Sequence, residues 1–121
     1  DVLTHAVMDA LLGAAALGDI GKLFPDSDAR YAGADSTALL RQVTAVLAEA
    51  GWTIVNVDAT VAAQAPRLAP FILEMRERLA AAMGLEAGRV SVKATTEEGL
   101  GFTGSGEGIA AHAAALVEKT A

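Results

Sequence analysis

The 121-residue sequence contains no cysteine. Disulfide bonds and thiolate metal sites are therefore excluded, and a bound metal would need His, Asp, Glu, water or ligand oxygens. Such ligands suit hard or borderline ions such as Mg²⁺, Mn²⁺ and Zn²⁺. Aromatic residues make up only 4% of the chain and the formal net charge is −6. A nucleic-acid-binding surface needs basic groups and usually stacking rings, so we expect no nucleic-acid partner.

The sequence also lacks a long uninterrupted apolar run, although 53% of its residues are hydrophobic. The stretch LLGAAALG is broken by glycine and too short to span a bilayer, so we expect no membrane partner. The apolar excess predicts a buried interface between subunits. The length predicts a single domain over residues 1–121. No signal peptide is visible in the sequence, so we expect a cytoplasmic, bacterial location, with an upstream plastid-targeting segment as the alternative.

Apolar periodicity and capping residues, among them Asp35 as the N-cap of the second helix, predict the order helix, helix, strand, helix, strand, helix. The expected helices cover residues 1–17, 36–50, a segment from Pro66–Pro70 to residue 84, and 106–119. The expected strands cover residues 53–64 and 89–96. This pattern predicts an α/β (α+β) sandwich with a small mixed sheet covered by helices on one side. Two strands make too small a sheet to stand alone, so further strands would come from upstream or from neighbouring subunits.

The first predicted helix carries a polar stripe, because Asp1, His5 and Asp9 are spaced four residues apart. The other faces of this helix are apolar almost all round, which predicts burial, with the polar stripe facing a pocket or a subunit interface. In one interpretation Asp1 caps the helix while His5 and Asp9 form a structural pair. In the other, neutral His5 is a metal ligand oriented by a carboxylate.

Two further segments have both a structural and a functional interpretation. The loop DIGKLFPDSD carries the acids Asp19, Asp26 and Asp28 beside Pro25. It is either a solvated loop with Asx turns or a set of acceptors for ribose hydroxyls. The small residues of VAAQAPRLAP either allow tight helix packing or let a ligand approach the backbone at a strand end.

The stretch KATTEEGLGFTGSGEG, residues 93–108, places hydroxyls, acids and five glycines between a predicted strand and a predicted helix. Thr95 and Thr96 offer donors, the glycines expose backbone N–H groups, and the helix dipole would favour an anion. Glu98 could hold a Mg²⁺ that bridges phosphate oxygens. The alternative is a flexible glycine-rich turn.

These segments together resemble the 2-C-methyl-D-erythritol 2,4-cyclodiphosphate synthase family of the non-mevalonate isoprenoid pathway. The matching blocks are DVLTHAVMDALLGAAALGDIGKLFPDSD, NVDATVAAQAPRLAP and VKATTEEGLGFTGSGEGIA. The resemblance implies a lyase that cyclises a CDP-linked methylerythritol 2-phosphate and releases CMP by metal-assisted intramolecular phosphoryl transfer. It further implies a homotrimer with active sites between adjacent subunits.

The resemblance also assigns roles to individual residues. His5 would bind Zn²⁺ or another divalent metal, and Glu98 would bind Mg²⁺ or Mn²⁺. Thr96 would stabilise the transition state. The remaining substrate-binding residues would be Asp19, Ile20 and Gly21 at the ribose; Phe24, Pro25, Asp26, Ser27 and Asp28 at the methylerythritol phosphate; Ala63, Gln64, Ala65, Pro66, Arg67, Leu68 and Ala69 at the cytosine; and Thr95, Thr96, Glu97, Glu98 and Phe102 at the phosphates or on the substrate side.

Two features separate this sequence from the family pattern. The two other zinc ligands of the family, in an Asp-x-His motif, and a substrate-binding His-Ser are expected upstream of Asp1. Ser105 stands where many members carry Arg. An alternative function is therefore a non-catalytic, cytidine-nucleotide-binding or structural trimer of the same fold. A weaker alternative is an ordinary small α/β oligomer with structural loops and no nucleotide preference.

Overall fold

A computed structural model describes residues 2–24, 35–63, 68–95 and 109–120. Its helices and strands follow one another as α1 (Val2–Ala14), α2 (Ile20–Leu23), α3 (Ser36–Glu49), β1 (Trp52–Ala62), α4 (Ile72–Met83), β2 (Val90–Thr95) and β3 (Ala110–Lys119). Short 3-10 turns at Ala69–Phe71 and Ala87–Arg89 precede α4 and β2.

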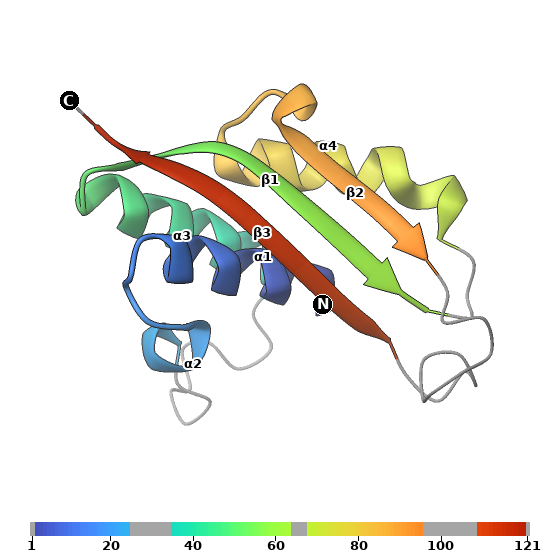
Figure 1. The fold of residues 1–121 in the computed structure, drawn as a ribbon, viewed down its shortest axis with the longest axis horizontal. Coiled ribbons are helices and arrows are strands. Elements are labelled where there is room, and N and C mark those ends of the chain that lie inside the picture. The colour runs from blue at the N-terminus through green and yellow to red at the C-terminus, as the bar shows by residue number, and fades with distance from the viewer. Residues whose placement is uncertain (1, 25–34, 64–67, 96–108, 121) are drawn as a thin grey trace.

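The three strands form one mixed sheet in the order β2-β1-β3 (Figure 1). Strand β1 runs parallel to β2 and antiparallel to β3. The β1–β3 pairing runs from Trp52 opposite Lys119 to Ala62 opposite Ala110, with an irregularity between Ile54 and Asn56. The expected small mixed sheet is therefore confirmed, with one strand more than the sequence analysis predicted.

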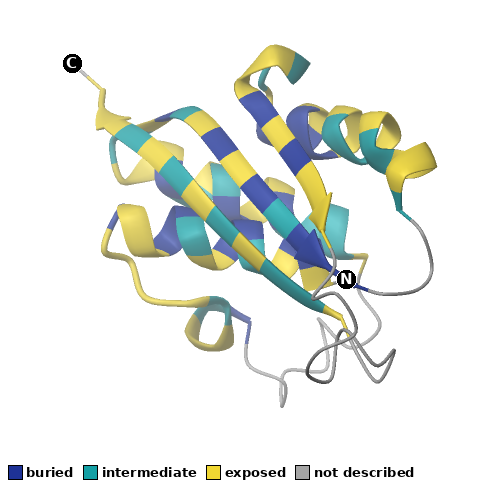
Figure 2. Ribbon diagram, turned by 45° about the vertical axis from the view of Figure 1, so that its right-hand side comes forward, coloured by how far each residue is buried: buried dark blue, intermediate teal, exposed yellow. Residues whose placement is uncertain are grey.

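The long helices α1, α3 and α4 cover one face of this sheet, as expected (Figures 1 and 2). Along β1 the buried residues Ile54, Val57, Ala59 and Val61 point toward the helices, and their exposed or half-buried neighbours point away. The helical side of the core is formed by fully buried residues: Val7, Met8, Leu11, Leu40, Val43 and Leu47. A single apolar layer thus joins the helices to the sheet.

The predicted helix over residues 106–119 is wrong, because Ala110–Lys119 forms the strand β3. Alanine has the highest helix propensity, and this weak local preference favoured a helix. Tertiary contacts override it here, since β3 pairs with β1 over its whole length and alternates between half-buried and exposed residues in its central part.

Other boundaries shift by a few residues. Helix α1 ends at Ala14, three residues early, and the turn that follows contains Ala16 at φ 57° and Gly18 at φ 101°. The predicted start of the third helix at Pro66–Pro70 is also early, because α4 begins only at Ile72, after the 3-10 turn. The four-residue helix α2 was not predicted. The N-cap Asp35 is confirmed, since its side chain accepts a hydrogen bond from Thr37 N.

Within the described residues, every helix is too short or too polar to cross a membrane.

Replacing Leu40 by alanine should lower the free energy of unfolding by about 3 kcal/mol, because a fully buried leucine leaves a cavity in the core. Leu73 on α4 is 60% exposed, so Leu73→Ala is the matched control and should change stability by less than about 0.5 kcal/mol. Urea unfolding followed by circular dichroism measures both. Equal losses in the two variants would contradict the assignment of Leu40 to the core.

Candidate functional site

Three chain segments meet at one edge of the sheet. Thr95 at the end of β2 and Ala110 at the start of β3 both lie opposite Ala62, the last residue of β1. The segment 63–68 therefore leaves from the same edge at which residues 96–109 begin and end. Loops at the carboxyl ends of parallel strands are where open α/β sheets bind ligands, so this edge is the candidate site.

Backbone hydrogen bonding extends the edge by one residue. Ala63 N donates to Thr95 O at 3.0 Å, and Ala63 is buried. The N–H of Ala63 is therefore committed to the sheet and does not face a ligand. On the far side of the predicted cytosine segment, Leu68 is half-buried and Ala69 is exposed at the start of the 3-10 turn. The structure thus brings Ala63 and Thr95 together.

The predicted ribose residues form a tight capped turn. Asp19 is the N-cap of α2, and its Oδ1 accepts from Lys22 N at 2.9 Å. A Cβ atom on Gly21 would lie 3.2 Å from that same Oδ1, so glycine leaves room for the carboxylate. Phe24 ends the turn: its N donates to Ile20 O at 2.7 Å and its side chain is buried in the core. The turn thus holds Asp19 and the Gly21 backbone side by side.

The burial of α1 differs from the expectation. His5 and Asp9 are exposed, and so is Val2, so α1 is not buried all round. The helix buries one face on the core and turns His5 and Asp9 outward. The carboxylate of Asp9 accepts from Ile20 N at 2.9 Å, which links α1 to the start of α2. The sequence suggested an orienting carboxylate beside His5 but gave no sign of this bond.

Helix α2 and the candidate edge lie far apart within one chain. In Figure 1, α2 is at the lower left, whereas the carboxyl ends of β1 and β2 point to the lower right. The structure therefore assembles the predicted site in two parts: the Asp19 turn with α1, and the edge formed by Ala63, Thr95 and Ala110.

Many predicted site residues lie outside the described residues: Pro25, Asp26, Ser27, Asp28, Gln64, Ala65, Pro66, Arg67, Thr96, Glu97, Glu98 and Phe102. The described residues contain no group of three His, Asp or Glu side chains that could hold a metal. The expected helix dipole behind the glycine-rich segment is wrong, because β3 follows that segment in place of a helix. Any anion binding there would need backbone N–H groups, hydroxyls or cations.

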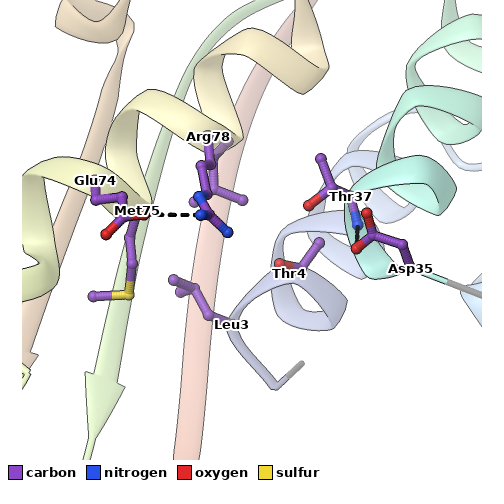
Figure 3. A pocket seen from close by; sticks show the side chains of 8 residues that line it. Leu3, Thr4, Asp35, Thr37, Glu74, Met75 and Arg78 are labelled. Atoms are coloured by element: carbon purple, nitrogen blue, oxygen red, sulfur yellow. Dashed lines mark hydrogen bonds and ion pairs between the residues drawn. The ribbon is translucent and has the colours of Figure 1, made fainter.

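A cavity of about 240 Å³ lies between α1, α3 and α4, and the sequence analysis did not identify it. Figure 3 shows Arg78 and Glu74 on its α4 wall, joined by an ion pair of 2.8 Å, and Asp35 bonded to Thr37 N on its α3 wall. Its charged groups are thus already paired with one another or with the backbone. None of the predicted site residues lines this cavity.

The strand that leads into KATT carries an ion pair on the open face of the sheet. Lys93 Nζ donates to both carboxylate oxygens of Asp58, at 2.6 and 2.8 Å, and so ties β2 to β1. This hydrogen bonding holds the pKa of Asp58 below its ordinary value of 3.8. The pair fixes the strand just before Thr95.

Comparison with known proteins agrees with this architecture. The profile of the YgbB family matches residues 1–118. The 2-C-methyl-D-erythritol 2,4-cyclodiphosphate synthase of Pseudomonas aeruginosa is 63% identical over 117 residues, which cover 97% of this chain and 74% of that protein.

Solved structures agree as well. The bifunctional IspDF of Campylobacter jejuni superposes with a TM-score of 0.94 at 43% identity, covering 98% of this chain and 32% of that one. The chain thus spans about a third of that longer protein. A CDP complex of IspF from Plasmodium falciparum superposes with a TM-score of 0.86 at 28% identity, covering 100% and 72% of the two chains.

Replacing Lys93 by methionine should raise the pKa of Asp58 toward 3.8, because the charged donor is lost. A lowered folded-state pKa means that the pair stabilises the fold above the ordinary pKa, and that this contribution disappears as the pH falls through the folded value. Lys119→Met is the matched control. It also removes one lysine charge, which in this case lies over the Trp52 ring. NMR titration of the Asp58 carboxyl carbon measures both variants, and an unchanged pKa in Lys93→Met would contradict the pairing.

Proposed function

Because the chain belongs to the YgbB family, with 2-C-methyl-D-erythritol 2,4-cyclodiphosphate synthases as close relatives, we propose that it carries out their reaction. The substrate is a CDP-linked methylerythritol 2-phosphate. An oxygen of its 2-phosphate bonds to the β-phosphorus, the bond from that phosphorus to the bridging oxygen of the α-phosphate breaks, and CMP leaves. The products are a cyclic diphosphate and CMP, which makes the enzyme a CMP-releasing lyase.

Such a reaction needs positioning more than covalent chemistry by the protein. The attacking and leaving groups belong to one substrate, so holding the 2-phosphate in line with the β-phosphorus supplies much of the rate. The observation that carries the proposal is the edge at which Ala62, Thr95 and Ala110 lie in register. The proposed cytosine segment would start at this edge beside the proposed diphosphate segment, which supports the binding of one CDP-linked substrate.

Each part of the site has a proposed task. At the edge, Ala63–Ala69 would bind cytosine, chiefly through backbone groups other than the committed N–H of Ala63. Thr95 and Thr96 would contact the phosphates, with Thr96 stabilising the transition state. In the second part, Asp19–Gly21 would hold the ribose, with the Asp19 carboxylate accepting from its hydroxyls. Phe24–Asp28 would line the methylerythritol phosphate.

The separation of the two parts supports a site shared between subunits. Helix α2 and the candidate edge lie far apart in one chain (Figure 1), so the turn of one chain would meet the edge of the next. A closed homotrimer with three interfacial sites is the arrangement that we propose. The sheet face opposite the helices would lie against neighbouring copies, and it exposes Leu116 to 56%.

Two divalent metals belong to the proposal. His5 is exposed on α1 and can offer its imidazole to Zn²⁺, with the other ligands coming from outside the described residues. Glu98 would hold Mg²⁺ or Mn²⁺. When bound, such cations neutralise charge on the diphosphate. The residues of the chain would position the cytosine, the ribose and the 2-phosphate.

Calorimetric titration of CDP into the chain in the presence of Mg²⁺, with UDP as the control ligand, tests the proposed function. We expect CDP to bind about ten-fold or more tightly than UDP, because a site that hydrogen-bonds the cytosine edge leaves groups unpaired with uracil. Sedimentation of the same sample establishes whether it is a trimer. Equal affinity for CDP and UDP in a folded trimer would contradict the proposal.

The two histidines of the chain allow a matched test of the zinc ligand. His5→Ala should lower bound zinc after metal loading and desalting, because an imidazole ligand is lost. His112→Ala removes the other exposed histidine, on β3, and should leave the zinc content unchanged. Elemental analysis per chain measures both, and equal zinc in His5→Ala and the unaltered chain would contradict the role of His5.

A further inference from the structure

The bond between Asp9 and Ile20 joins two segments that are eleven residues apart in sequence. Asp9 lies on the exposed side of α1, and its Oδ1 accepts from Ile20 N at 2.9 Å. Ile20 is the first residue of α2, directly after Asp19. The carboxylate of Asp9 is therefore bonded to the same peptide unit that carries the carbonyl of Asp19.

The amino end of the α2 turn is more exposed than its carboxyl end, although the half-buried Ile20 side chain packs against the core. Residues 16–19 are all exposed, and none of the four residues of α2 is fully buried. Its carboxyl end is anchored by the buried Phe24 and by the 2.7 Å bond from Phe24 N to Ile20 O. At the amino end, the described residues show one non-local hydrogen bond, which Ile20 N donates to Asp9.

Fixing the orientation of the Ile20 N–H also fixes the direction of the Asp19 side chain. The peptide unit is planar, so the orientation of that N–H follows the ψ angle of Asp19, which is 174°. With φ at −141° and ψ held at this value, the direction in which the Asp19 side chain leaves the backbone is determined. The capping bond from Lys22 N to Asp19 Oδ1 then holds the carboxylate in place.

We infer that Asp9 is a positioning residue, which holds the Asp19–Gly21 turn in the orientation that receives a ribose. This inference rests on the proposed function, since it takes the ribose contact of Asp19 and Gly21 from there. His5 lies one helical turn before Asp9 on the same exposed stripe of α1. The bond from Asp9 thus also sets the distance between the proposed metal ligand and the proposed ribose turn.

Three variants separate this role from general stability. Asp9→Ala removes the acceptor. Asp9→Asn keeps a carbonyl oxygen that can accept from Ile20 N, so it should restore most of the effect. Asp35→Ala is the matched control, because Asp35 also accepts from a backbone N–H, that of Thr37 at 3.1 Å, but caps α3 and not the ribose turn.

The readout is the ratio of the dissociation constants of 2′,3′-dideoxy-CDP and CDP, measured by calorimetry with Mg²⁺ in the full chain. The unaltered chain should prefer CDP, because the dideoxy sugar offers no hydroxyl to Asp19. Asp9→Ala should reduce this preference about ten-fold, while Asp9→Asn and Asp35→Ala should keep it within about two-fold. In parallel, hydrogen exchange of the Ile20 amide should become faster in Asp9→Ala alone.

The outcomes distinguish this inference from the function on which it rests. If the unaltered chain prefers CDP and Asp9→Ala keeps the full preference, the inference is overturned and the proposed function stands. Unchanged exchange of the Ile20 amide in Asp9→Ala would overturn it as well. If the unaltered chain binds no CDP, the proposed function fails and the inference fails with it.

Discussion

The apolar layer between the helices and one face of the sheet determines the rest of the structure. Its members are fully buried on both sides, with Val7, Leu40 and Leu47 from the helices and Val57 and Ala59 from β1. Burying this layer contributes most of the stabilisation available to a chain of this size. This layer holds the three strands in one sheet, in which the carboxyl ends of β1 and β2 and the start of β3 lie together at the candidate edge.

The mixed strand directions decide which strand ends lie at the candidate edge. Parallel pairing places the carboxyl ends of β1 and β2 at one edge, and antiparallel pairing brings the start of β3 to the same edge. The glycine-rich segment therefore leaves the sheet at Thr95 and returns to it at Ala110, beside Ala62. A helix over residues 106–119, as the sequence predicted, would not have closed the segment in this way.

Local signals in the sequence predicted those features that short-range contacts decide. Asp35 was recognised as a cap because its side chain bonds an amide two residues away. The alternation in β1 was recognised because each of its side chains lies on a buried or an open face. The β3 strand was missed because its many alanines favour a helix, while its partner residues on β1 lie 48 (Ala62 and Ala110) to 67 (Trp52 and Lys119) positions earlier. The helix α2 was missed because four residues are too few to show a period.

The segments of the candidate site could be proposed from the sequence, but the contacts between them could not. A resemblance in three blocks identified the segments, and i, i+4 spacing placed His5 and Asp9 on one stripe. The spacing could not reveal that Asp9 reaches Ile20, since that bond depends on the chain reversing through Ala16 and Gly18. An exposed carboxylate bonded to a neutral N–H adds little to global stability, because water competes for both groups. Its effect is instead local, and so the consequence of losing it should appear in ligand binding before it appears in unfolding.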